Sequence, residues 1–73
     1  MKVWIVEHDN GDYNNVCGVY SSPLKAYEAI HKFLIEEGGY YDPFVKELDR
    51  HYEDDKDNFY SGDYYADMYE LDN

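Results

Sequence analysis

The chain has 73 residues, with 17 acids and 6 bases, which gives a net charge of −11. This length predicts one small domain over residues 1–73, and the 44% of hydrophobic residues argues against disorder along the whole chain. The charge argues against direct binding to nucleic acid or to an anionic membrane, because both require positive charge. No segment approaches the ~20 apolar residues of a membrane span.

Cysteine usage and the first residues indicate a compartment. Cys17 is the single cysteine, whereas a secreted domain of this size usually carries several disulfides. The start Met1-Lys2-Val3-Trp4 leads into no long apolar run of the kind that a signal peptide needs. We therefore expect a cytoplasmic protein.

A β-hairpin is predicted at the start of the chain. The segment Val-Trp-Ile-Val is β-branched or aromatic, which predicts a strand over residues 2–8. Asn10-Gly11 marks a turn, because both residues tolerate a positive φ, and residues 13–20 are the predicted return strand. A two-residue turn would pair Ile5 with Val16, although two further asparagines leave the register open.

A helix is predicted over residues 22–37. Ser22 can cap it, and Pro23 suits the first helical position. A stripe at helical spacing forms its predicted core face: Ala26, Tyr27, Ile30, Phe33 and Leu34.

A second helix is predicted from Asp42-Pro43 to about Tyr52, by the same cap and proline pattern. Its predicted core face holds Phe44, Leu48 and Tyr52, with Val45 beside them. The charged run over residues 53–58 is predicted to be a solvated loop, because acids at the negative end of a helix are unfavourable.

The last segment, residues 62–72, fits two patterns. Tyr65, Tyr69 and Leu71 alternate with polar residues as in a strand, whereas Met68 and Leu71 also fit a helical stripe. We favour the strand, because a two-stranded hairpin alone is marginally stable. The predicted fold class is then α+β, a small antiparallel sheet in the order ββααβ with two helices packed on one face.

Residue types that carry out catalysis or bind metals are few. Cys17, His8, His31 and His51 are the candidates, and the histidines fall on three different predicted elements without the spacing of a metal site. A domain this small also has little room for a cleft that excludes water. We therefore predict no enzymatic activity, no metal and no cofactor.

The acids concentrate in the second half of the chain. Residues 38–73 hold eleven acids and three bases, and residues 1–37 hold six acids and three bases. Eight acids fall between residues 53 and 72, where Lys56 is the one base. Such self-repulsion destabilises a small fold, so the acids either keep the surface soluble or present a field to a cationic partner.

The size of the charge suggests a comparison with DNA. Eleven charges equal those of roughly 19 Å of B-DNA, and a compact chain of this length has a radius of gyration of about 11 Å. The predicted partner-binding acids are Glu53, Asp54, Asp55, Asp57, Asp63, Asp67, Glu70 and Asp72, and the predicted anchoring tyrosines among them are Tyr60, Tyr64, Tyr65 and Tyr69. Ten tyrosines exceed what so small a core buries, which also predicts a homodimer.

The order of segments supports a resemblance. Val3-Trp4-Ile5-Val6, then Gly18-Val19-Tyr20-Ser21-Ser22 leading into a helix with Lys25-Ala26, and then an acidic, tyrosine-rich end resemble small phage and prophage proteins. In size and charge the chain is also similar to phage-encoded DNA mimics that block restriction enzymes, CRISPR nucleases or the nucleoid protein HU. The segment pattern covers about a third of the chain and transfers no site residue. It implies an inhibitor used in host takeover or against host defence.

We therefore expect a DNA-mimic inhibitor that binds the DNA-contact surface of a basic host protein, either a nucleoid protein or a defence nuclease, in the host cytoplasm. Two alternatives stay open. One is an acidic accessory or regulatory subunit that its partner recognises through a tyrosine-rich face. The other is a structural dimer module whose acidity is incidental.

Overall fold

The structure, a computed structural model, describes residues 1–39, 42–54 and 57–71, except for the side chain of Asp54. Within these ranges the chain forms the elements β1 (Lys2–Asp9), β2 (Asn14–Tyr20), α1 (Pro23–Gly38), α2 (Pro43–Asp54), β3 (Asn58–Ser61) and β4 (Tyr64–Glu70). The predicted α+β class is confirmed, and the last segment is a strand as favoured. β3 is an additional strand that the sequence did not predict.

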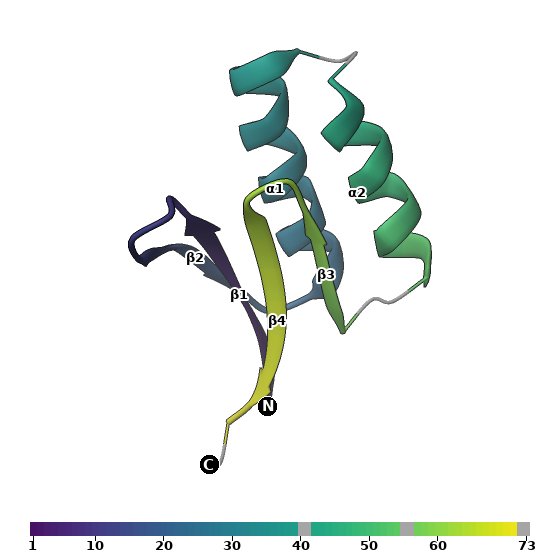
Figure 1. The fold of residues 1–73 in the computed structure, drawn as a ribbon. Coiled ribbons are helices and arrows are strands. Elements are labelled where there is room, and N and C mark those ends of the chain that lie inside the picture. Colours follow the sequence, from purple (N-terminus) through teal and green to yellow (C-terminus); the bar gives the residue numbers. More distant parts are fainter. Residues whose placement is uncertain (40–41, 55–56, 72–73) are drawn as a thin grey trace.

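The strands form one antiparallel sheet in the order β2-β1-β4-β3. The central strands, β1 and β4, come from opposite ends of the described chain and lie side by side (Figure 1). Backbone hydrogen bonds continue this pairing past the strands: Leu71 N donates to Met1 O at 2.7 Å, and the amino group of Met1 donates to Leu71 O at 3.3 Å.

Both helices pack on the same face of the sheet. α1 contacts β1, β2 and β4, and α2 contacts β3 and α1. Ser22 caps α1, since its Oγ accepts a hydrogen bond from Lys25 N at 3.2 Å, and Pro23 is the first helical residue. Gly39 ends α1 with a φ of 81°, which glycine adopts without strain. The predicted helix over residues 22–37 is confirmed to within one residue at each end.

The core lies between the helices and this covered face of the sheet. It contains Trp4, Val6, Ala26, Ile30, Leu34, Val45, Leu48, Phe59, Tyr64 and Ala66. On β1, β3 and β4 the core residues alternate with residues outside the core, because successive strand residues point to opposite faces. The alternate residues therefore lie on the other face of the sheet, which neither helix covers.

The hairpin turn between β1 and β2 is longer than predicted. Four residues, 10–13, connect the strands, and Oδ1 of Asn10 accepts hydrogen bonds from two backbone N–H groups within the turn. Together with a β-bulge in the ladder, this turn pairs Ile5 with Val19 rather than with Val16. The predicted register was wrong because an asparagine side chain supports a longer turn than the Asn-Gly pair alone suggests.

The segment after α2 also differs from the prediction. α2 continues to Asp54, and β3 begins at Asn58, at the end of the predicted loop over residues 53–58. Tertiary contacts account for the strand: Phe59 is buried in the core, and the fully buried Ser61 donates a hydrogen bond to the carbonyl of Phe44. Packing against α2 thus accounts for the strand over residues 58–61, of which the predicted loop included Asn58 alone and the other three residues had no assigned structure.

Of the predicted core residues of α2, Tyr52 is partly buried against the core, and Phe44 lies outside it. Phe44 is 45% exposed, and Val45 and Leu48 are the residues of α2 that the core buries. The Phe44 ring lies against Gly62 in the turn between β3 and β4, within 3.3 Å of the position where a Cβ of residue 62 would stand. The apolar stripe of α2 is therefore rotated by one residue from the predicted face.

Ile30→Ala tests the packing of α1. Because the Ile30 side chain is fully buried, we expect the free energy of unfolding to fall by about 2–5 kcal/mol in urea denaturation. Leu24→Ala on the same helix is the control: Leu24 is 52% exposed, and the loss should stay below ~1 kcal/mol. An unchanged melting temperature for Ile30→Ala would contradict this packing.

Candidate partner-binding face

The uncovered side of the sheet, here called the open face, is formed by the residues of β1, β3 and β4 that alternate with the core residues, together with the residues of β2 that pair with them. It comprises Val3, Ile5 and Glu7 of β1, Val16 and Val19 of β2, Asn58 and Tyr60 of β3, and Tyr65, Asp67 and Tyr69 of β4. Four of its large side chains are strongly exposed: Val16 (64%), Val19 (58%), Tyr60 (47%) and Tyr69 (46%). At the β3 edge the ring of Tyr60 lies 4.5 Å from that of His51 on α2. A sheet face on which valines and tyrosines are this exposed is typical of an interaction surface.

Asp67 lies at the centre of the open face. Across the sheet it pairs with Ile5 on one side and Asn58 on the other, and along β4 it stands between Tyr65 and Tyr69. It is half-buried, and burial, followed by repulsion from Glu7, raises the pKa of its carboxyl above the ordinary value. Among the residues that the structure describes, no base or hydrogen-bond donor contacts this carboxylate.

Glu7 is a second acid on the open face, and the sequence prediction missed it. It pairs with Tyr65 across β4 and with Val16 across β2, so it is a diagonal neighbour of Asp67. Its Oε2 accepts a hydrogen bond from Nδ2 of Asn14 at 3.3 Å. The alternation Val3, Ile5, Glu7 indicates that these residues share a face, but the pairing of β1 with β4 cannot be deduced from it.

Three of the four predicted tyrosine anchors lie on the open face. Tyr60 and Tyr65 are paired across β3 and β4, with ring centroids 5.9 Å apart and ring planes 25° from parallel. Tyr69 follows two residues beyond Asp67. Tyr65 and Tyr69 therefore flank Asp67 along β4, and Tyr60 lies beside Tyr65 on β3.

Tyr64 corrects the prediction. Its ring is buried on the helix side of the sheet, stacked on His8 and Phe33 at centroid distances of 4.6 and 5.5 Å. Its hydroxyl donates a hydrogen bond to Glu37 Oε1 at 2.6 Å, and burial and this carboxylate raise the pKa of the phenol. Tyr64 is therefore a core residue and offers no anchoring contact on the surface.

The predicted acids that the structure describes are distributed over several elements. Asp57 precedes β3, Asp63 lies in the turn before β4, Glu70 ends β4, and Glu53 is in the last turn of α2, all of them exposed. Asp55 and Asp72 lie outside the described residues, and only the backbone of Asp54 is described. Of the described set, only Asp67 shares a face with the tyrosines.

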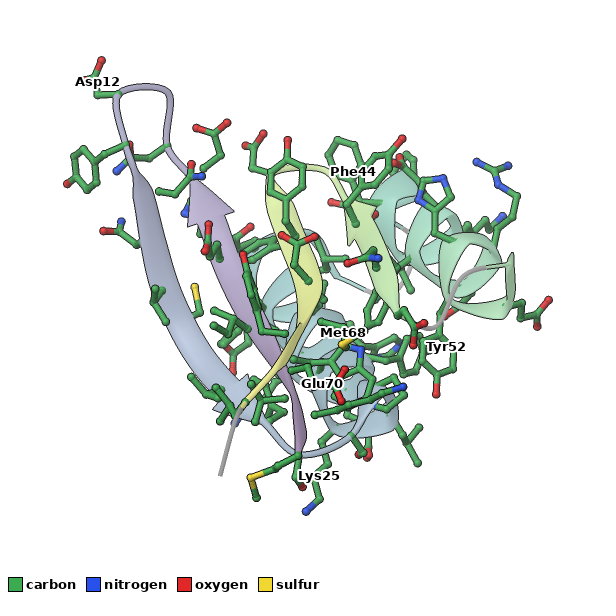
Figure 2. The ribbon with its side chains drawn as sticks, turned by 90° about the horizontal axis from the view of Figure 1, so that it is seen from below. Asp12, Lys25, Phe44, Tyr52, Met68 and Glu70 are labelled. Carbon is green, nitrogen blue, oxygen red and sulfur yellow. The ribbon has the colours of Figure 1, made fainter. Side chains whose placement is uncertain are left out.

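The charges are divided unequally between the sheet and the helices. The strand layer, residues 1–22 and 57–71, carries the acids Glu7, Asp9, Asp12, Asp57, Asp63, Asp67 and Glu70, with Lys2 as its one base. The described helices carry four bases among their acids: Lys25, Lys32, Lys46 and Arg50. In Figure 2, Asp12 lies at the tip of the hairpin, and Lys25 lies at the opposite end of the view.

The candidates for catalysis and metal binding are dispersed. Within the described ranges, no group of three or more histidine, cysteine or acidic side chains is placed to hold a metal ion. His51 is engaged within the fold, with Nδ1 2.7 Å from the carbonyl of Tyr60. Cys17 is exposed on β2, and partial burial, Glu37 and Glu7 raise the pKa of its thiol, which disfavours the nucleophilic thiolate.

No helix in the described part of the chain is both long and apolar enough to cross a membrane. Comparison with known proteins found no matching family model, no matching curated protein and no matching solved structure. The geometry of the open face and the division of charge are therefore the observations on which a function can be proposed.

Asp67→Asn tests whether burial and repulsion from Glu7 make the charged Asp67 carboxylate unfavourable in the folded chain. A carboxyl with a raised pKa binds its proton more tightly in the folded chain, so stability falls as the pH rises through the range between its unfolded and folded pKa values. We expect the asparagine variant to be more stable than the natural chain at neutral pH, and this gain to disappear in acid.

Thermal unfolding measured over a pH series checks this expectation. Asp63→Asn, at an exposed position off the open face, controls for the loss of one negative charge from a strongly acidic chain. An equal gain in both variants would assign the effect to net charge and not to the position of Asp67.

Proposed function

We propose that this protein is a binding module and not an enzyme, and that it occupies the DNA-contact surface of a basic DNA-binding protein by mimicking the charge of DNA. The observation that carries the proposal is the strand layer, which holds seven acids and a single base and includes an open face of valines and tyrosines on which Glu7 and Asp67 lie. Such a surface complements a partner rich in lysine and arginine. The proposed target class is a nucleoid protein or a defence nuclease in the host cytoplasm.

The magnitude of the charge limits how far the mimicry extends. The radius of gyration of 11.9 Å is close to the expected value, but the molecule measures 41 Å along its longest axis. B-DNA of that length carries about 24 negative charges, against a net 11 here. The protein therefore has about half the linear charge of DNA along this axis, and charge alone would bind a shared partner more weakly than DNA does.

The open face can supply the missing affinity. Tyrosine and valine side chains contribute to binding by removing apolar surface from water, and exposed tyrosines are frequent energetic centres of interfaces. Because these side chains lie on the same layer as the acids, one partner can contact both. The proposed mode of binding thus combines electrostatic attraction with a non-polar contact that salt does not screen.

The alternative reading, an acidic accessory or regulatory subunit recognised through a tyrosine-rich face, is supported by the same three tyrosines. It differs from the proposal in two respects: the partner need not be basic, and the acids contribute little to the binding affinity. A structural dimer module remains the third reading, and the homodimer itself remains a prediction.

Competition with duplex DNA tests the proposal. The chain should displace a basic DNA-binding protein from labelled DNA in a gel-shift assay at low salt, and its affinity should fall as salt rises, because exposed charges are screened beyond the ~10 Å Debye length at 0.1 M. If no nucleoid protein or defence nuclease is displaced at low salt, the mimic proposal fails.

A pair of double variants separates location from net charge. Asp63→Asn with Glu70→Gln removes two exposed charges from the strand layer, and we expect binding to weaken about fivefold, at on the order of 0.5 kcal/mol for each exposed charge. Glu28→Gln with Glu36→Gln removes two exposed charges from α1 and should weaken binding less. Equal losses would show that only net charge matters, and tolerance of both would favour the accessory-subunit reading.

A further inference from the structure

We infer that the open face is the docking surface for an arginine side chain of the partner, with Asp67 as the carboxylate that receives it. The inference deepens the proposed function and rests on it, because it names the residue type through which a basic partner is recognised. It depends on a juxtaposition that the sheet creates: one carboxylate surrounded on its own face by aromatic, aliphatic and amide side chains from three strands.

The spacing of a sheet fits one guanidinium group to this position. Neighbours across strands have Cβ atoms about 4.5–5.5 Å apart, and residues two apart on one strand stand roughly 7 Å apart. Asp67 thus has Ile5 and Asn58 at the shorter distance, and Tyr65 and Tyr69 at the longer one. A flat group that pairs with the carboxylate is therefore within reach of either the Tyr65 or the Tyr69 ring, and it can stack on one of them, because these residues stand roughly 14 Å apart.

The occupant of this face must bring a positive charge. Covering the face with a neutral surface would remove the Asp67 carboxylate from water without a partner, which is costly. Within the described chain no base fills this role, since Lys2 stands among the helix-side residues of β1 and the other described bases are on the helices. A second copy placed face to face would set the carboxylates of Glu7 and Asp67 against the same acids, so like charges disfavour it.

Arginine suits the site better than lysine. Its guanidinium is planar, carries five donors in a fixed arrangement, stacks on aromatic rings and is less strongly hydrated than an ammonium group. Tyr60 and Tyr65 already lie with their rings near parallel, so a planar cation over Tyr65 extends an existing stack. Glu7, diagonal to Asp67, adds a second carboxylate that the same guanidinium or a neighbouring base can reach.

The experiment uses two fluorescent peptides of equal length and charge, oligoarginine and oligolysine, titrated into the full chain at several salt concentrations. Both should bind more weakly as salt rises, with similar slopes, because the slopes report the number of charges neutralised. The arginine peptide should bind about three- to tenfold more tightly at every salt concentration, because stacking is not screened. Equal affinities would overturn the inference.

Two matched variants test whether the preference for arginine over lysine depends on Asp67. Asp67→Asn should abolish the preference for arginine, whereas Glu70→Gln, on the same strand but at a helix-side position and exposed, should weaken both peptides equally and preserve it. Tyr65→Leu keeps the face apolar and should reduce the preference without changing the salt slope. Circular dichroism checks that each variant is folded, and Glu7→Gln gives a second reading of the same face should Tyr65→Leu unfold.

The outcomes separate this inference from the proposed function. A chain that competes with DNA for a basic protein, but does not distinguish arginine from lysine, retains the proposed function and refutes the docking site. A chain that binds neither peptide and displaces no DNA-binding protein refutes both. Self-association that Asp67→Asn strengthens, measured by light scattering, would assign the face to a second copy and overturn the inference.

Discussion

The antiparallel pairing of β1 with β4 is the contact on which the rest of the structure depends. It joins residues 2–8 to residues 64–70, and the hydrogen bonds between Met1 and Leu71 extend it to the ends of the described chain. Both helices lie between these strands in sequence, and both pack on one face of the sheet. The contact has a high sequence separation, and its loop-closure entropy must be offset by burial of Trp4, Val6 and Ala66 beneath the helices.

The same pairing creates the candidate site. On the helix side, the two central strands contribute the core. On the other side, their alternate residues bring Ile5 and Glu7 of β1 next to Asp67 and Tyr65 of β4. Two acids separated by sixty residues in sequence thus meet as diagonal neighbours on a face rich in tyrosine and valine. The pairing of β1 with β4 that closes the sheet therefore also brings the carboxylates of Glu7 and Asp67 close enough to repel each other. This repulsion lies on the open face, where a partner could relieve it.

The sequence predicted what depends on local patterns, and it failed where distant contacts decide. Ser22, Pro23 and the apolar stripe of α1 predicted that helix to within one residue, because capping and periodicity are local. β3 was missed, since Phe59 and Ser61 become strand residues only by packing beneath α2. The hairpin register was wrong because the Asn10 side chain supports a longer turn and a β-bulge shifts the ladder by one further residue.

For the candidate site too, the sequence predicted the features that depend on local patterns and missed those that depend on distant contacts. Alternation along β4 was enough to place Tyr65 and Tyr69 on one face, but which face the helices cover depends on tertiary packing. The assignment of Tyr64 to the surface therefore failed, although it is adjacent to Tyr65 in sequence. Glu7 could not be added to the site from the sequence, because its proximity to Asp67 requires the pairing of the first strand with the last.

The position of Asp67 has a consequence for selectivity as well as for affinity. A face of tyrosine and valine without a charge would adhere to many apolar surfaces, including its own copy. A half-buried carboxylate at its centre penalises each neutral or acidic surface that covers it, because the charge would lose water without gaining a partner. A cationic surface removes this penalty and also gains the apolar contact. In the proposed mode of binding, Asp67 would therefore restrict this apolar face to partners of opposite charge, and the net charge of −11 would attract such partners from a distance.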